Sequence, residues 1–184
     1  LDAPSELAVA LQGPGSRTGI AVLRLERDAQ GAFAWNEISS VDTIYPPLSI
    51  AASDLNGDGR RDLAILISER GADTKCFVVT ALRREDGNWD RLDPFPVGFR
   101  PYRVVSGDID GDGRGEILVS AQNSHHVELW TSTAPFAGKF VRTADLGLHA
   151  GCLDVLLADL DKDGAPEIVV ANGFSNDVGV VKLR

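Results

Sequence analysis

The chain has 184 residues, of which 43% are hydrophobic, and its 27 acidic and 18 basic residues give a formal net charge of −9. This length suits one or two ordinary domains, and no long apolar span is present that would insert into a membrane. Lysine and arginine form no basic stripe, which argues against nucleic acid as a partner. Eleven acidic residues gather in three short loops, so the charge belongs mostly to local sites.

Short segments rich in β-branched residues follow one another along the chain, and none has helical periodicity over ten residues. The N-terminal part predicts strands at 6–10, 19–25 and 33–39. The next part predicts strands at 48–53, 62–68, 76–82 and 89–92. The third part predicts strands at 102–107, 116–121, 126–131 and 140–146. The last part predicts strands at 153–158, 167–171 and 178–183. The predicted fold class is therefore all-β.

These strands form a repeat, because three similar acidic loops start 54 and then 51 residues apart. Four short antiparallel strands in about 50 residues match a β-propeller blade. We expect one partial propeller domain over 1–184, in which the first repeat lacks its leading strand and the last lacks its final strand. The approximate repeats are 1–47, 48–100, 101–151 and 152–184. A parallel β-helix is the structural rival, although its repeats are usually shorter.

The three acidic loops read D-x-[DN]-x-D-G-x-x-[DE], and we name them loop A (54–62), loop B (108–116) and loop C (159–167). Oxygen ligands at alternating positions suit a hard cation such as calcium. Positions 1, 3, 5 and 9 offer side-chain oxygens, position 7 offers its backbone carbonyl, and the glycine at position 6 allows a sharp turn with positive φ. The predicted ligands of about three calcium ions are Asp54, Asn56, Asp58, Arg60, Asp62, Asp108, Asp110, Asp112, Arg114, Glu116, Asp159, Asp161, Asp163, Ala165 and Glu167.

The same loops have two alternative interpretations, an EF-hand and a plain acidic turn. An EF-hand needs a glutamate at position 12 and a helix on each side. Position 12 is Ile65, Val119 or Val170 here, inside an apolar run that predicts a buried strand, so the sequence argues against an EF-hand. The loops could also be plain acidic turns between strands. Three copies with the glycine fixed favour calcium.

The N-terminus fits the same template. Asp2 falls at position 5 of a fourth, half-present loop, Ala3 replaces the glycine, and Glu6 falls at position 9. Because positions 1 and 3 are missing, we expect this half-loop to bind no metal.

Segments 107–120 and 158–172 carry the clearest copies of the motif. They resemble the FG-GAP/VCBS repeats of integrin α-subunit propellers and of many bacterial secreted proteins, and the resemblance extends over nearly the whole chain. The FG-GAP dipeptides themselves are not clearly present, which favours the bacterial branch. The resemblance implies structural calcium within each blade and a parent ring of seven or eight blades. Four incomplete blades would then need further sequence, or another copy of the chain, to close a ring.

Several other side chains have two interpretations. His125 and His126 could start a transition-metal site, but a solvated turn is favoured. His149 near Cys152 could form a nucleophile pair, although no third orienting group is evident. Cys76 and Cys152 lie two repeats apart, too far for a disulfide, and two buried thiols are expected.

The tryptophans Trp35, Trp89 and Trp130 could form stacking platforms for sugars, but packing within or between blades is favoured. Polar loop tips could form a binding face, as loops on a rigid scaffold often do. These tips are 16–18, 69–74 and 172–177.

We expect a non-catalytic recognition or adhesion module that binds a glycan or a protein. The loops imply an extracellular or periplasmic location, where calcium is millimolar. A secreted polysaccharide-degrading enzyme and a structural spacer are the alternatives, since propellers host all three roles.

Overall fold

The structure is a computed structural model that describes residues 5–12, 18–69, 75–121, 126–133, 136, 138–147 and 151–183. Its described residues form fifteen β-strands in four sheets. No helix within these residues is long and apolar enough to span a membrane.

Each sheet is built from strands that follow one another in the sequence, and every pairing is antiparallel. Blade 1 contains β1 (Glu6–Leu11), β2 (Gly19–Arg27) and β3 (Phe33–Asp42). Blade 2 contains β4 (Pro47–Ser53), β5 (Asp62–Ser68), β6 (Cys76–Arg83), β7 (Trp89–Arg91) and β8 (Phe95–Val97). Blade 3 contains β9 (Pro101–Gly107), β10 (Glu116–Ala121), β11 (His126–Ser132) and β12 (Phe140–Gly147). Blade 4 contains β13 (Cys152–Ala158), β14 (Glu167–Asn172) and β15 (Asp177–Val181).

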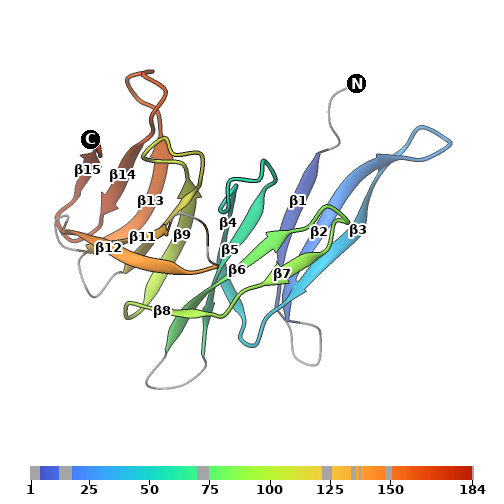
Figure 1. The fold of residues 1–184 in the computed structure, drawn as a ribbon, viewed down its shortest axis with the longest axis horizontal. Coiled ribbons are helices and arrows are strands. Elements are labelled where there is room, and N and C mark those ends of the chain that lie inside the picture. Colours follow the sequence, from blue (N-terminus) through green and yellow to red (C-terminus); the bar gives the residue numbers. More distant parts are fainter. Residues whose placement is uncertain are drawn as a thin grey trace.

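The four blades stand side by side in chain order, with blades 1 and 4 at opposite ends (Figure 1). Their inner strands touch, because β4 contacts β9 and β9 contacts β13. Small residues permit this approach: the hydroxyls of Ser53 and Ser106 form a hydrogen bond between blades 2 and 3, and a Cβ on Gly107 would come within 2.9 Å of Leu157. The structure confirms the predicted all-β fold of propeller-type blades.

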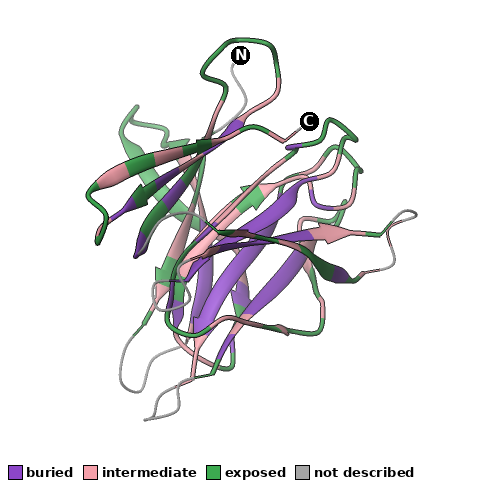
Figure 2. Ribbon diagram, turned by 90° about the vertical axis from the view of Figure 1, so that its left-hand side faces the viewer, coloured by how far each residue is buried: buried purple, intermediate pink, exposed green. Residues whose placement is uncertain are grey.

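The central strands are buried on both faces because a blade packs against each side (Figure 2). Successive side chains of a strand point to opposite faces of the sheet. In β5, Leu63, Ile65 and Ile67 pack toward blade 1, whereas Ala64 and Leu66 pack toward blade 3. β10 divides its residues between blades 2 and 4 in the same way. The continuous apolar runs in the sequence therefore mark strands that belong to two cores at once.

The last blade keeps one open face. Ile168 and Val170 of β14 are fully buried against blade 3. On β15, Val178 and Val180 are 66% and 55% exposed. The face of blade 4 that carries Val178 and Val180 has apolar residues at alternate positions, as an inner blade does. None of the described residues of another blade packs on it.

The outer edge of blade 2 differs from the sequence expectation. One outer strand was expected, at 89–92, and β7 confirms it, but no strand was predicted at 95–97. The structure instead has two short strands, β7 and β8, which pair with opposite ends of β6. The break falls at Asp93 and Pro94, since proline has no N–H to donate to a neighbouring strand.

Candidate metal centre

Loops A, B and C each connect the first and second strands of a blade, in blades 2, 3 and 4 respectively. The predicted turn glycine at position 6 has positive φ in every loop, with φ of 83°, 87° and 95° at Gly59, Gly113 and Gly164. Position 4 also has positive φ, which sequence reasoning missed. Glycine occupies it in loops A and B, but loop C has Lys162 there with φ of 63°.

The aspartate at position 1 organises each loop around its carboxylate. In loop A, Asp54 accepts hydrogen bonds from the backbone N–H groups of Gly57 at 2.7 Å and Gly59 at 2.6 Å. In loop B, Asp108 accepts the equivalent bonds at 2.7 and 3.0 Å, and in loop C Asp159 accepts one from Gly164 at 3.0 Å. The backbone is thereby curled so that the side chains at positions 1 and 3 turn inward.

The carboxylate at position 9 closes each loop from below and is buried in all three. It accepts a hydrogen bond from the backbone N–H at position 2, over 2.9 Å for Asp62 and 2.8 Å for both Glu116 and Glu167. Sequence reasoning missed this role of position 2. A visible signal was present, since Leu55 and Ile109 are apolar residues within otherwise polar loops, and both are buried.

Three carboxylates converge in loop B and three in loop C. Asp108, Asp110 and Glu116 each place one oxygen within 4.8 Å of the others, and Asp159, Asp161 and Glu167 do the same. Positions 1, 3 and 9 are therefore brought together as predicted. In loop A, position 3 is Asn56, whose amide donates to Asp58 over 2.9 Å.

The predicted ligands at positions 5 and 7 are arranged differently. The backbone N–H groups of Arg60, Arg114 and Ala165 donate to the position 5 carboxylates at 2.9, 2.9 and 3.0 Å. In loops A and B the arginine guanidinium also pairs with that carboxylate, Arg60 with Asp58 and Arg114 with Asp112. In loops A and B the position 5 carboxylate thus has a cationic partner at position 7 of its own loop, which sequence reasoning missed because it assigned only the backbone carbonyl at position 7 as a ligand.

Loop C has a cation from outside the motif. The ammonium of Lys182 lies 2.7 Å from Asp161, 2.5 Å from Asp163 and 3.0 Å from Glu167. Hydrogen bonds to these carboxylates raise the pKa of Lys182. Sequence reasoning missed Lys182 because it reaches loop C through the pairing of β14 with β15.

The buried carboxyls of loops A and B have raised pKa values. Burial, reinforced by Asp110, Asp112 and Asp108, raises the pKa of Glu116 from 4.5 to about 7. Burial, reinforced by Asp58 and Asp54, raises the pKa of Asp62 from 3.8 to about 6. In loops A and B the oxygen ligands at positions 1, 3 and 9 have no ion pair among the described residues, and such ligands fit a hard divalent cation. The loops are thus chemically suited to hold such an ion.

A comparison with protein families finds the FG-GAP-like repeat model twice in this chain, at residues 54–119 and 108–170. Together the two matches cover more than half of the 184 residues. The chain belongs to the FG-GAP-like repeat family. Each match begins at position 1 of an acidic loop and ends in the second strand of the following blade, so the family repeat includes the loops described above. No curated protein matches the chain.

The half-loop before the first FG-GAP-like repeat match contains Glu6, whose carboxylate is held by two arginines. Arg24 lies 2.8 Å from its Oε1, and Arg83 lies 2.5 Å from its Oε2. The hydrogen bond from Arg83 is the main reason that the pKa of Glu6 is lowered. Asp2 lies outside the described residues, so the expectation that this half-loop binds no metal stays a prediction.

The histidines only partly follow the sequence expectation. His126 is the first residue of β11, where the strand predicted at 126–131 begins, and it is half-buried rather than solvated as expected. Its Nε2 lies 3.7 Å from both Glu128 and Asp145. His125 and His149 lie outside the described residues.

Both cysteines of this FG-GAP-like repeat protein are buried thiols, as predicted, and no disulfide joins them. Burial raises the pKa of Cys152 from 9.0 to about 11, so its thiol stays protonated near neutral pH. A protonated thiol is a poor nucleophile, which argues against the alternative of a cysteine nucleophile.

The tryptophans mostly pack within and between blades. Trp130 is 9% exposed, with its ring centroid 4.6 Å from that of Phe95. Trp89 of blade 2 donates a hydrogen bond of 3.0 Å to Ser39 of blade 1. Trp35 is 46% exposed, so the packing prediction holds for two of the three.

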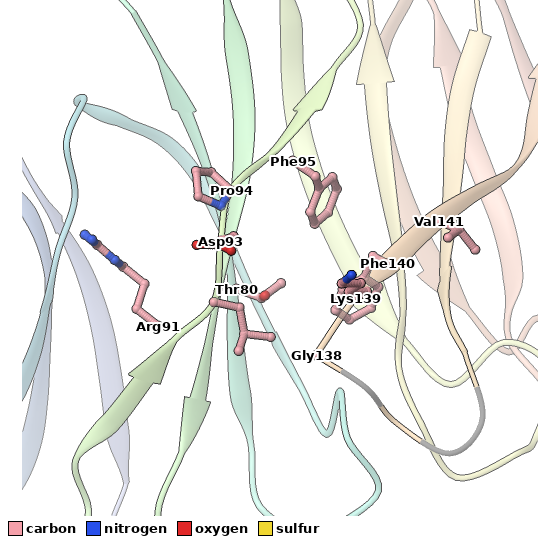
Figure 3. A pocket seen from close by; sticks show the side chains of 10 residues that line it. Thr80, Arg91, Asp93, Pro94, Phe95, Gly138, Lys139, Phe140 and Val141 are labelled. Carbon is pink, nitrogen blue, oxygen red and sulfur yellow. The ribbon is translucent and has the colours of Figure 1, made fainter.

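A cavity of about 540 Å³ opens between the outer edges of blades 2 and 3 (Figure 3). Phe95 and Phe140 stack on each other at its edge, with ring centroids 5.8 Å apart, and Thr80 and Lys139 also line it. The break between β7 and β8 forms one of its walls. The cavity follows from the interrupted edge strand of blade 2.

Proposed function

We propose that this FG-GAP-like repeat protein is a calcium-stabilised, non-catalytic recognition module. The observation that carries the proposal is the convergence of three carboxylates in loop B and again in loop C. Calcium takes six to eight oxygen ligands and accepts carboxylates, carbonyls and water together. Asp108, Asp110 and Glu116 would hold the ion in loop B. Asp159, Asp161 and Glu167 would hold it in loop C, and Asp54, Asn56 and Asp62 in loop A.

The metal would act on stability rather than on a substrate. Position 9 is the first residue of β5, β10 or β14, and position 1 directly follows β4, β9 or β13. An ion that binds both positions therefore ties together the two inner strands of a blade. Calcium that binds only the folded loop stabilises the fold by mass action. The raised pKa of Glu116 supports this role, because a bound cation would remove the cost of its buried negative charge.

Two features support the proposed recognition role: the rigid array of blades and the proposed location of the protein outside the cytosol. Sites of this kind fill where calcium is millimolar, so we place the protein outside the cytosol, in an extracellular or periplasmic compartment. A rigid array of blades presents its connecting loops to a glycan or protein ligand. The exposed valines of β15 would be covered by a further blade or by a second copy of the chain.

A thermal melt followed by circular dichroism tests the calcium proposal. We expect millimolar calcium to raise the melting temperature above its value in EDTA by about 10 °C, and magnesium to raise it much less. Asp108→Ala should abolish a large part of the calcium effect. Asp93→Ala, which alters an exposed aspartate outside the loops, should retain all of it. An equal melting temperature in EDTA and calcium would show that the loops are acidic turns only.

A further inference from the structure

A shallow depression of about 520 Å³ lies beside loop A, where blade 1 meets blade 2. We call it the arginine depression, after the five arginines that line it, which are Arg24, Arg60, Arg61, Arg83 and Arg84. Only three carboxylates share its lining, those of Glu6, Glu85 and Asp86. Positive charge is therefore concentrated here in a chain whose formal net charge is −9.

Glu6 shows which chemistry the depression accepts. Its two carboxylate oxygens receive hydrogen bonds from Arg24 at 2.8 Å and from Arg83 at 2.5 and 3.3 Å. Two guanidinium groups from different blades thus hold a single oxyanion. Planar guanidinium groups match carboxylate and sulfate geometry, and such charge-assisted hydrogen bonds are among the strong ones.

Several donors around Glu6 are not used by it. The Nε of Arg24 is buried and has no hydrogen-bond partner within the part of the chain that the structure describes. Because this atom is closed to solvent, a ligand would meet the guanidinium groups of Arg61 and Arg84 instead. Among the described residues, Arg84 forms only long ion pairs, 3.6 Å from Asp86 and 3.4 Å from Asp90, and its side chain is 54% exposed. Arg61 reaches the carbonyl of Ala52 over 3.4 Å.

The residue types that line the depression also favour a polar ligand. Glycine and charged residues make up the lining of the depression, so it offers no apolar pocket that would anchor a hydrophobic side chain. A saccharide that carries sulfate or carboxylate groups suits such a lining, because its hydroxyl and oxyanion groups can all meet polar partners.

We propose that the arginine depression binds a sulfated or carboxylated saccharide. Arg61 and Arg84 would contact its oxyanion groups, while Arg24 and Arg83 continue to hold Glu6 at the floor. This inference rests on the recognition role proposed above and names the class of ligand that is recognised. It does not depend on calcium binding. If loop A does bind calcium, the added charge beside Arg60 should strengthen binding.

The test measures binding of a heparin-derived oligosaccharide by isothermal titration calorimetry, in calcium and in EDTA. We expect the double variant Arg61→Gln/Arg84→Gln to weaken the Kd at least about tenfold, since both charges would meet the ligand. Arg103→Gln is the matched control, because Arg103 has a 52% exposed side chain and pairs with Asp154 at 3.2 Å. This control should leave the Kd within about twofold of the unchanged protein. Circular dichroism of each variant establishes that it is folded.

Each competing outcome overturns the proposal. An equal loss in Arg103→Gln would show general charge attraction rather than a site. Inorganic sulfate that binds as tightly as the oligosaccharide would indicate a free-oxyanion site, and polyglutamate that binds as tightly would indicate an acidic peptide. The outcome is separable from that of the thermal melt, because the calcium effect can fail while the arginine variants still weaken binding in EDTA.

Discussion

Loops B and C have the same ligand spacing but differ in how their negative charge is balanced. In loop C, Lys182 lies between Asp161, Asp163 and Glu167. In loop B, Arg114 pairs with Asp112, and no ion pair within the described residues reaches Asp108, Asp110 or Glu116. The consequence appears at the buried glutamate of loop B, because burial and the neighbouring aspartates raise the pKa of Glu116 to about 7. The loop motif thus specifies the candidate ligands, whereas a residue outside the motif, Lys182, determines whether an ammonium group competes with a metal ion for them.

The strand register explains where that residue comes from. Ile168 pairs with Val181 in blade 4, and Ile117 pairs with Trp130 in blade 3. One residue further along, Lys182 lies opposite Glu167, and Thr131 occupies the equivalent place opposite Glu116. Loops B and C are therefore distinguished by the residue at this position, which is the neutral Thr131 in blade 3 and Lys182 in blade 4.

The largest expected effect is on the buried glutamate of loop B. Glu116→Ala removes the acceptor of the Ile109 N–H and one predicted calcium ligand. We expect a loss of roughly 2–4 kcal/mol in the free energy of unfolding in calcium, measured by urea denaturation. The same experiment on Glu167→Ala should give a smaller calcium-dependent loss, because Lys182 already competes in loop C. Equal losses would contradict the distinction between the two loops.

The second effect concerns Lys182 itself. Lys182→Thr should strengthen calcium binding to loop C about tenfold, because the ion no longer has to displace an ammonium group. The same variant should melt at a lower temperature in EDTA, since three carboxylates lose their cation. Calorimetric titration with calcium measures the first change. The reciprocal variant, Thr131→Lys, should weaken binding to loop B, and unchanged affinity in both variants would exclude competition.

The third effect is a dependence of the melting temperature on pH, which should appear only when no metal is bound. The pKa values of Glu116, about 7, and Asp62, about 6, are both above their ordinary values. A carboxyl with a raised pKa binds its proton more tightly in the folded state, so it favours folding at low pH and loses that contribution as the pH rises through the folded pKa.

In EDTA we therefore expect the melting temperature to fall between about pH 5 and pH 8, by a few degrees. Calcium should remove the trend, because it stabilises the ionised form. Glu116→Gln should reduce the trend in EDTA, and Asp145→Asn, outside the loops, should not. A melting temperature that rises with pH in EDTA would contradict the assignment.

The smallest effect is expected at position 4. Lys162 adopts a φ of 63°, which costs a residue with a side chain about 1 kcal/mol or more relative to glycine. Lys162→Gly should relieve this strain, but glycine also makes the unfolded chain more flexible, which offsets part of the gain. We expect a net stabilisation of about 0.5 kcal/mol by urea denaturation in EDTA. Gly111→Lys should destabilise loop B, and a gain there would contradict the backbone argument.

Local pattern predicted the strands and the loops because both depend on neighbouring residues. The apolar run 63–67 gave a buried strand, and the fixed glycines gave the turns with positive φ. Contacts between distant residues were not predicted: Lys182 reaches loop C through a strand pairing, and Glu6 meets Arg83 across two blades. β8 was missed because Pro96 lies within it, and a proline in a short apolar run argues against a strand.

The shared burial of β5 and β10 has a consequence for how such arrays can grow or shrink. Each inner blade contributes one half of two different cores, so its interactions are with its nearest neighbours only. Inserting one more blade between two others would add one blade and one interface, and would leave the packing at every other interface unchanged. A duplication of about fifty residues should therefore have only a small effect on the stability of the existing blades. A polar substitution at Ile65 or Leu66, in contrast, would destabilise the packing of two adjacent blades.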